Sequence, residues 1–597
     1  MEQTTIEPGT RVRGPLWQDR ITRATDRFAG GNGIAVLLSG AVCSVILLLV
    51  LILLAASFLA DFPVESRISL ENYESVFHGI FFSEILPNTL FVGIGTVAVS
   101  LAFGIPLAWL IHRTNLPYGN LFLTLIAVSV IVPGFLRGIG WILLLSPKVG
   151  LINHLLMSLF QLKNPPFDIN TLSGIAFIQG LMMTSPVVFL LAGPMRNIDP
   201  ALEEASEIAG ARRWKTMLRI VIPILLPAVL GGAIYVFMTA ISLFEVAALL
   251  GGLGGKNAVV ATELFLSIYT LSASVPAYGV SGVYGVIIAV PSLFALYYYF
   301  VAIRQSHRYV TVSGKGYRCK IHDLGLWKGV GLAFVLFFLT LAVFLPLVIL
   351  LWASLLPYLQ IPSRQAFSAM TLESYFRIAQ IPGMGRMIWN TIVLVITVSV
   401  AVLIFSFMIS WIVTRTKLRI RGFVDGIAML PHAFPNVGFA LALLVLALVL
   451  RKYLPSVPFY GTVGIIALAH TLTRISYGTR VANAALLQIS PELEEVAYVC
   501  GSKQLTVWMK VILPTVSRSL VFLFLWTLLL SFREVTMALM LTGPDNQVLA
   551  TYVFTTWLRG DLNFTAAIGV IMVLAMGILF LIVEKLTTAR MNVGGFS

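Results

Sequence analysis

Charged side chains are scarce in this chain of 597 residues. Asp, Glu, Lys and Arg together make up 11% of the sequence, whereas hydrophobic residues make up 58%, and the mean hydropathy is +0.93. A soluble globular domain carries about 25% charged residues, so the composition excludes that class. It predicts an integral membrane protein embedded in the lipid bilayer.

Cysteine is also scarce, with only Cys43, Cys319 and Cys500 in the chain. Three cysteines support neither a disulfide framework nor a cysteine metal site. His432 and His470 have no second histidine or carboxylate one helical turn away, which a helical metal site requires. The sequence therefore predicts no metal site.

The chain lacks the phosphate-binding loop Gly-x-x-x-x-Gly-Lys-Ser/Thr. Gly255-Lys256 is followed by Asn257, and Gly314-Lys315 has no upstream glycine at the required spacing. We therefore expect that this chain does not hydrolyse ATP by itself, and that the energy for its work comes from a partner.

Long apolar runs are abundant. A hydrocarbon core of roughly 30 Å is crossed by about 20 helical residues, and backbone groups in lipid must pair within the segment, which favours helices. We expect twelve transmembrane helices, near residues 34–60, 90–112, 121–145, 172–195, 223–250, 278–303, 328–353, 391–413, 426–450, 462–485, 514–541 and 563–584.

Basic residues gather in the segments before and between these runs. They include Arg11, Arg13, Arg20, Arg23 and Arg27 before the first run, and Arg304, Arg308, Lys315, Arg318 and Lys320 at the centre of the chain. This is the positive-inside pattern of membrane proteins. The net charge of +14 thus reflects topology rather than a nucleic-acid partner, and both termini are predicted to be cytoplasmic.

The two halves of the sequence repeat each other. The matching groups are Leu70-Glu71-Asn72-Tyr73 with Leu372-Glu373-Ser374-Tyr375, Asn88-Thr89 with Asn390-Thr391, Arg113-Thr114 with Arg415-Thr416, and Pro133 with Pro435. Six spans in each half make the repeats parallel. We expect a cytoplasmic segment 1–33, a first half 34–303, a cytoplasmic linker 304–327, a second half 328–585 and a cytoplasmic tail 586–597.

One polar segment occurs in both halves, at 197–223 and 488–514. Glu204, Gly210 and Pro223 in the first copy have the same spacing as Glu495, Gly501 and Pro514 in the second. The matching groups of the preceding paragraph lie 302 positions apart, whereas the two copies of this segment lie 291 positions apart, so the two separations differ by 11 residues. The first half therefore holds an insertion, expected around 146–171, where Leu151–Phe160 has the pattern of a short interfacial helix.

The polar segment has the pattern of two short helices. Glu203 and Glu204 follow Pro200 and would lie in the first turn of a helix, where carboxylates complement the positive end of the macrodipole. Gly210 provides a position for a sharp turn. A second helix would then carry the basic residues Arg212, Arg213, Lys215 and Arg219.

This spacing resembles the EAA loop of bacterial ABC importer permeases: Glu-Ala-Ala, three residues, Gly, nine residues, then Ile-x-Leu-Pro. Here Ser206 replaces the second alanine of the first copy and Val496 the first alanine of the second copy. The resemblance implies the all-α type I importer permease fold and loops that dock on an ATPase. The residues implied in coupling are Glu204, Ala205, Gly210, Pro223, Glu495, Ala497, Gly501 and Pro514.

The resemblance further implies a non-enzymatic permease subunit of the bacterial inner membrane. Its implied partners are two copies of a cytoplasmic ABC ATPase subunit, which would hold ATP and Mg²⁺, and a periplasmic substrate-binding protein. The linker Tyr309–Gly316 and the run Ser531–Glu534 ahead of Leu541–Pro544 look like those of ferric-iron importer permeases. Polyamine, thiamine, sulfate and aminoethylphosphonate permeases are similar alternatives, and an ion-gradient-driven secondary transporter is the alternative of another class.

A few ionisable residues fall inside the predicted spans. Insertion of such a residue costs about 2.5–3.5 kcal/mol, so it usually faces the bundle interior or a water-filled cavity. Glu245 in the fifth span corresponds to Glu534 in the eleventh, where Arg533 precedes it. We expect these three residues beside the translocation path or its outer gate. The alternative is an interhelical hydrogen bond that fixes packing.

Overall fold

The computed structural model describes residues 32–60, 67–211, 213–252, 254–269, 276–306, 321–456 and 459–589. This part is helical apart from one antiparallel pair of short strands, β1 (Leu59–Ala60) and β2 (Arg67–Ile68), which confirms the all-α prediction. Most of the predicted N-terminal segment 1–33, the linker sequence Tyr309–Gly316 and the end of the tail 586–597 lie outside the described residues.

The helices of the two halves follow each other in the same order. The first half contains α2 (Asn32–Ser57), α3 (Glu71–His78), α4 (Leu86–Arg113), α5 (Gly119–Ile131), α6 (Gly134–Leu145), α7 (Leu151–Phe160), α8 (Leu172–Arg196), α9 (Pro200–Ile208), α10 (Arg213–Thr216), α11 (Ile222–Ser242), α12 (Glu245–Gly251), α13 (Val260–Tyr269) and α14 (Tyr278–Ser306). The second half contains α15 (Lys328–Leu339), α16 (Leu345–Ser354), α17 (Arg364–Ser368), α18 (Glu373–Gln380), α19 (Met384–Arg415), α20 (Arg421–Ala433), α21 (Asn436–Tyr453), α22 (Val463–Leu487), α23 (Glu492–Val499), α24 (Gln504–Val507), α25 (Leu513–Phe532), α26 (Thr536–Leu541), α27 (Leu549–Leu558) and α28 (Leu562–Ala589).

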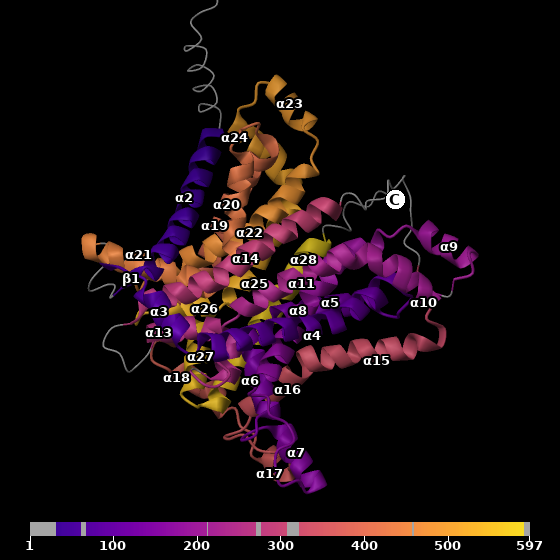
Figure 1. The fold of residues 1–597 in the computed structure, drawn as a ribbon, viewed down its shortest axis with the longest axis vertical. Helices are drawn as coiled ribbons and strands as arrows, with labels where there is room; N and C mark the ends of the chain where they lie inside the picture. The colour runs from indigo at the N-terminus through magenta and orange to yellow at the C-terminus, as the bar shows by residue number, and fades with distance from the viewer. Residues whose placement is uncertain are drawn as a thin grey trace, which may run out of the picture.

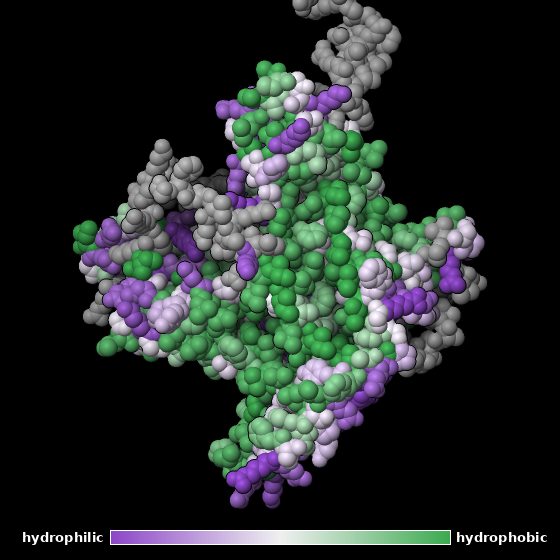
Figure 2. All heavy atoms as spheres, turned by 180° about the vertical axis from the view of Figure 1, so that it is seen from behind, coloured by the Kyte–Doolittle hydropathy of each residue, from purple (hydrophilic) through white to green (hydrophobic). Residues whose placement is uncertain are grey.

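Nine single helices of the described part are long and apolar enough to cross a membrane, and the pair α5 and α6, bent by 94°, makes a tenth. The sequence predicted twelve spans. The other two predicted spans coincide with α14, whose apolar stretch covers Tyr278–Phe294, and with α22, whose apolar sequence is interrupted by His470, Arg474 and Arg480. Figure 2 shows apolar side chains over the helical body and hydrophilic ones near its ends.

The first helix of each half packs against the other half. α2 lies against α19, α20 and α21, whereas α15 lies against α4 and α16 against α6. Figure 1 shows α2 beside α19 and α20, and α15 running below α4. The two halves are therefore joined by exchanged helices as well as by the linker.

The repeated Tyr residues have the same role in both halves. The hydroxyl of Tyr73 in α3 hydrogen-bonds to the Ser57 hydroxyl at the end of α2, with an O–O distance of 2.8 Å. The hydroxyl of Tyr375 in α18 hydrogen-bonds to Ser354 at the end of α16 at 2.7 Å. Each tyrosine thus holds a short helix to the first long helix of its half.

The repeated Asn-Thr pair fixes the start of the next long helix. Asn88 Nδ2 of α4 donates to the carbonyls of Lys256 and Ala258, both at 3.0 Å. Asn390 of α19 makes the same two bonds to the segment before α27, both at 3.1 Å. The repeat in the sequence therefore corresponds to a repeated contact.

Four π-helical turns occur in the described part, and each precedes a helix whose second residue is proline. They are Phe81–Ile85 before Pro87, Met217–Val221 before Pro223, Thr340–Phe344 before Pro346, and Trp508–Ile512 before Pro514. Proline has no N–H and clashes with the carbonyl four residues earlier, and a π turn admits one more residue at this point. Proline therefore sets the place of each irregular turn.

The predicted insertion of the first half forms α7, with the expected bounds Leu151–Phe160. Buried Asn153 holds this excursion together. Its Nδ2 donates to the carbonyls of Leu145 at 2.9 Å and Phe167 at 2.8 Å, and its Oδ1 accepts from the Phe167 N–H at 3.1 Å.

The substitution Asn88→Ala leaves the carbonyl of buried Ala258 without its donor, which costs about 1–3 kcal/mol, whereas the carbonyl of exposed Lys256 can accept from water. We expect a lower Tm for the purified protein in thermal unfolding, and the same direction of change for Asn390→Ala. Exposed Asn120 on α5 supplies the control Asn120→Ala. A Tm for Asn88→Ala equal to that of the control would contradict a stabilising role for this contact.

Candidate functional site

The two polar segments form short helices that project from separate arms of the helical body, α9 at one and α23 at the other (Figure 1). The Asp199 carboxylate begins α9 by accepting from the Ala201 N–H at 2.9 Å. The Ser490 hydroxyl accepts from the Glu492 N–H at 3.4 Å before α23. A polar residue before each helix thus satisfies one of its first N–H groups.

The predicted turn at each glycine is confirmed. Gly210 has φ +76° and Gly501 has φ +81°, a region that other L-residues adopt only at a cost. After α9, the Ala211 N–H donates to the Ser206 carbonyl at 3.0 Å, and after α23 the Ser502 N–H donates to the Ala497 carbonyl at 3.0 Å. Both helices therefore end in a Schellman motif that requires the glycine.

Side chains then hold the two short helices of each segment together. Ser206 hydrogen-bonds to Thr216 of α10 at 2.8 Å, and the Tyr498 hydroxyl donates to Gln504 of α24 at 2.9 Å. Each segment is thus a compact unit that leads through its π turn into α11 or α25.

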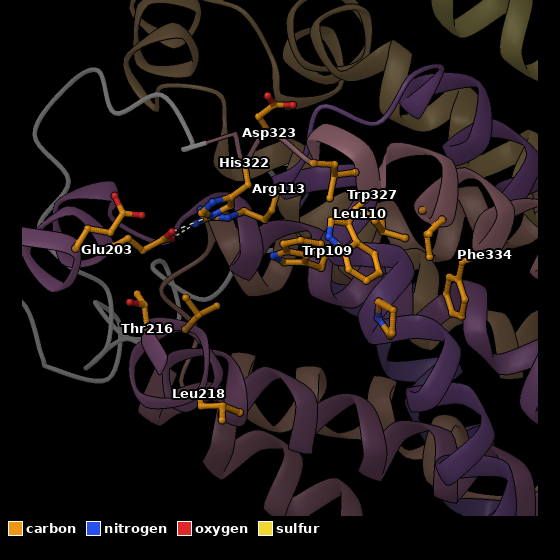
Figure 3. A pocket seen from close by; sticks show the side chains of 16 residues that line it. Trp109, Leu110, Arg113, Glu203, Thr216, Leu218, His322, Asp323, Trp327 and Phe334 are labelled. Carbon is orange, nitrogen blue, oxygen red and sulfur yellow. Dashed lines mark hydrogen bonds and ion pairs between the residues drawn. The ribbon is translucent and has the colours of Figure 1, made fainter. Parts of the chain in front are cut away.

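A buried ion pair attaches the first segment to α4, as Figure 3 shows. Glu203 of α9 is 2% exposed and pairs with Arg113, the last residue of α4. Arg113 also donates to the Met195 carbonyl at 3.3 Å. The second oxygen of Glu203 lies 2.9 Å from His322 Nε2, so one carboxylate joins α9, α4 and the end of the linker.

The end of the linker is fixed by further contacts. The His322 N–H donates to the Arg113 carbonyl at 2.8 Å, and the His322 ring stacks on Trp109 with centroids 6.2 Å apart. Asp323 accepts from the Gly325 N–H, from Asn115 and from Lys328, and these interactions lower the pKa of its carboxyl to about 2. The described end of the linker is therefore part of the first segment's support.

The second segment has the same anchor without the histidine. Glu494 of α23 lies 2.9 Å from Arg415 Nε at the end of α19. Arg415 also donates to the carbonyls of Leu486 and Ile489, at 2.7 and 2.8 Å. Burial raises the pKa of the Glu494 carboxyl, and the neighbouring Arg415 opposes that shift.

Sequence reasoning had selected the second glutamate of each pair and missed the first. Glu204, Glu495 and Ala205 are exposed, and Ala497 is half-buried. These residues are therefore accessible on the faces of α9 and α23 that point away from the rest of the protein. The sequence shows the anchoring arginines as the repeated pairs Arg113-Thr114 and Arg415-Thr416, but it does not show that they contact Glu203 and Glu494. His322 has no counterpart in the other half, so no repeat marks it as a site residue.

Glu245 lies at a break that the apolar sequence concealed. α11 ends at Ser242 and α12 begins at Glu245, so the predicted span 223–250 is interrupted. The Glu245 carboxylate accepts from the Phe135 N–H at the start of α6. It approaches Gly134 so closely that a Cβ there would overlap it. Glu245 thus joins α12 to the bend between α5 and α6.

Glu534 lies at the corresponding break between α25 and α26. Its carboxylate accepts from the Met537 N–H at 3.0 Å and lies 2.9 Å from His470 Nε2 of α22. This contact joins α22 to the break between α25 and α26. Neighbouring Arg474 donates to the Leu530 carbonyl at 2.9 Å.

Arg533 connects the two halves. Its guanidinium donates to the Val130 carbonyl of α5 and interacts electrostatically with Glu245 as well as with Glu534. Arg137 of α6 belongs to the same group through Arg533 and Glu245, and its Nε and Nη1 have no hydrogen-bond partner in the described part of the chain. Three arginines, two glutamates and His470 therefore form one charged cluster at the breaks of the spans, in which Arg137 and His470 are buried and the other four residues are half-buried.

The described residues contain no group of three or more His, Cys, Asp or Glu side chains placed to hold a metal ion. His432 stacks instead on Tyr235 of the first half, with ring centroids 5.4 Å apart.

Comparison with known proteins identifies the repeated architecture. The family model described as the binding-protein-dependent transport system inner membrane component matches residues 100–307 and again residues 406–593. The ferric transport system permease protein FbpB of Actinobacillus pleuropneumoniae is 25% identical over 558 residues, which cover 90% of this chain and 76% of that protein.

Two further proteins match about half of the chain or less. The spermidine/putrescine transport system permease protein PotB of Escherichia coli is 28% identical over 214 residues, 35% of this chain and 76% of that protein. A solved chain of a bacterial ABC transporter involved in alginate import has a TM-score of 0.37 and 20% identity, over 49% of this chain and 98% of its own length. On the double match to the family model, this chain belongs to the binding-protein-dependent transport system inner membrane components, with both permease halves of an ABC importer in one polypeptide.

Proposed function

We propose that this chain forms the translocation path for ferric iron in an ATP-driven importer. The observation that carries the substrate is the likeness to FbpB, which extends over 90% of the chain and so over both halves. A polyamine is the second candidate, favoured by the 28% identity to PotB, although that likeness extends over 35% of the chain.

In this proposal, α9 and α23 each receive one ABC ATPase subunit, which binds ATP and Mg²⁺, and a periplasmic binding protein delivers the substrate to the opposite side. The exposed Glu204 and Glu495 support docking at these helices. Both termini then lie in the cytoplasm, as the basic segments of the sequence indicate.

The anchors supply the mechanical connection between ATPase and spans. A movement of α9 displaces Arg113 through the buried Glu203, and Arg113 is the last residue of the long helix α4. Arg415 connects α23 to α19 in the same way. Closure of the ATPase subunits changes the path only if the two states differ in such contacts.

The charged cluster is the proposed gate within the path. Glu245, Arg533 and Glu534 lie at helix breaks, where irregular backbone in a membrane is tolerated if it is buried in protein or lines a water-filled cavity. Their contacts join both halves, so a change in the relative position of the halves must alter them.

The test begins with purification of the complex in mild detergent. A copurifying ATPase subunit is expected, and its retention should be lost in the double variant Glu204→Ala/Glu495→Ala because both docking helices lose an accessible carboxylate. Glu74→Ala/Glu373→Ala, at exposed residues of α3 and α18 outside the docking helices, is the control and should retain it. A chain that purifies alone under conditions that preserve other complexes would oppose the ATPase proposal.

The retained complex is then reconstituted with its binding protein, and uptake of radiolabelled ferric iron is compared with that of radiolabelled putrescine. ATP-dependent iron uptake is the expected result. Putrescine uptake would replace iron by the second candidate, and uptake driven by an ion gradient without ATP would reject the importer mechanism.

The substitution Gly210→Val should uncouple ATP hydrolysis from uptake. A valine in the left-handed region costs about 1–2 kcal/mol, and no heavy atom lies within 4 Å of the added Cβ, so the effect comes from the backbone turn rather than from a clash. We expect near-normal ATPase activity with uptake lowered about tenfold, equivalent to about 1.4 kcal/mol. Gly210→Asn should recover part of the uptake, and Gly422→Val on α20 is the control. Retained coupling in Gly210→Val would refute this role.

The substitution Glu245→Gln removes a charge from the cluster and keeps the shape of the side chain. If the cluster is the gate, uptake falls about tenfold while assembly and Tm stay near those of the unmodified protein. Glu263→Gln on α13, outside the cluster, is the control. Normal uptake with a lowered Tm would instead establish the packing interpretation.

A further inference from the structure

A cavity of about 670 Å³ lies beside the first coupling segment. Figure 3 shows it between α4, the turn before α11, and residues 322–334, which are the end of the linker and the start of α15. Its walls are apolar, formed by Trp109, Leu110, Leu218, Val330 and Phe334, and its polar end is the Arg113–Glu203–His322 anchor. Its volume is in the range of about 300–1,000 Å³ that accommodates small-molecule ligands.

The same place in the second half is filled by the protein's own side chains. Trp411 occupies the repeat position of Trp109, four residues before the anchoring arginine in each half. Its ring packs 5.2 Å from Trp508 and 6.2 Å from Phe407. Ala35 of the exchanged helix α2 is buried in the same cluster.

The sequence accounts for part of this difference between the halves. Trp508 lies 13 residues after Glu495, and the residue 13 positions after Glu204 is Met217. The first half therefore has a smaller residue type where the second has the tryptophan that completes its aromatic cluster. Because the two anchors are alike, the cavity is a local difference beside a shared structure.

The outer wall of the cavity is an exposed apolar surface. Val330 of α15 is 57% exposed, Leu218 is 48% exposed and Trp327 is 69% exposed. Both helices that carry the outer wall belong to segments able to cross a membrane, Gly325–Ser354 and Leu218–Ser242. The molecules that contact such a surface are the acyl chains of the bilayer.

The mouth of the cavity has the chemistry of a membrane interface. Trp109 and Trp327 line it, and tryptophan is enriched at the level of the lipid headgroups. Lys328, which follows Trp327, is held 3.3 Å from the Asp323 carboxylate, whereas exposed Arg219 follows Leu218 of the cavity wall. A phosphate at the headgroup level is therefore expected on the Arg219 side of the mouth.

We propose that one phospholipid of the cytoplasmic leaflet occupies this cavity with an acyl chain, with its phosphate near Arg219. The proposal rests on the membrane orientation given under the proposed function, and not on the identity of the substrate. The lipid contacts α4 beside Arg113 and thereby supports the anchor of the first coupling segment. The second segment receives the equivalent support from Phe407, Trp411 and Trp508.

The test is the number of phospholipids that the intact purified complex retains in native mass spectrometry. Val330→Trp fills the cavity from α15 and should remove one bound phospholipid per chain. Val348→Trp makes the same change at a 61% exposed position of α16 that does not line the cavity, and should retain the unmodified number. An unchanged number in Val330→Trp, or detergent as the only amphiphile retained, would overturn the proposal.

The second half offers the reciprocal measurement. Trp508→Met gives the second segment the residue found at position 217, and we expect it to retain one additional phospholipid. An unchanged number would overturn the assignment of Trp508 as the side chain that takes the place of the lipid.

A functional readout separates support of the anchor from mere occupancy. Delipidation should lower the ratio of uptake to ATP hydrolysis several-fold in the unmodified complex, and vesicles containing phosphatidylglycerol should restore it. In Val330→Trp the tryptophan replaces the acyl chain, so the ratio should change little on delipidation. An equal loss in both proteins would overturn the supporting role. The lipid count does not depend on which substrate is carried, so a failure of iron uptake leaves this result unaffected.

Discussion

The buried pairing of a glutamate with the arginine that ends a long helix is the interaction on which the coupling region depends. Glu203 with Arg113 and Glu494 with Arg415 occupy the same position in the two halves. A buried charge without its partner costs about 3–5 kcal/mol, whereas a complete pair is close to neutral relative to apolar packing. The anchor therefore contributes little to net stability, but it makes separation of the short helix from the long one unfavourable.

The rest of the region follows from this constraint. Because the first glutamate of each pair points inward, the second is left on the exposed side of the helix. The glycine that follows allows the chain to reverse, and the π turn before proline directs it into α11 or α25. The exposed face of α9 or α23 is thus connected through the buried ion pair to the long helix α4 or α19. The transfer of motion from a docked partner requires such a connection.

Much of this arrangement was predictable from the sequence because it depends on local rules repeated twice. Gly210 and Gly501 were placed correctly by their spacing, and α7 was found from a difference in offset. The broken spans were harder to predict: Pro133 and Pro435 mark two of the breaks, but the breaks after Ser242 and Phe532 carry no proline. Which glutamate of an adjacent pair is buried depends on the direction from which the arginine approaches, and this is a tertiary property.

The exchange of first helices has a consequence for the order in which the protein assembles. α2 is made first, yet its packing surfaces on α19, α20 and α21 are synthesised only with the second half. During that interval α14 is the long helix of the first half that packs against α2. The sequence of α2 carries no charged residue, which suits the faces later covered by α19, α20 and α21 to contact with lipid. α15 and α16, by contrast, enter a membrane that already contains α4 and α6. The packing of the first half is thus complete only when the second half has been inserted. If synthesis stops between the halves, the surface of α2 that α19, α20 and α21 would cover has no protein neighbour.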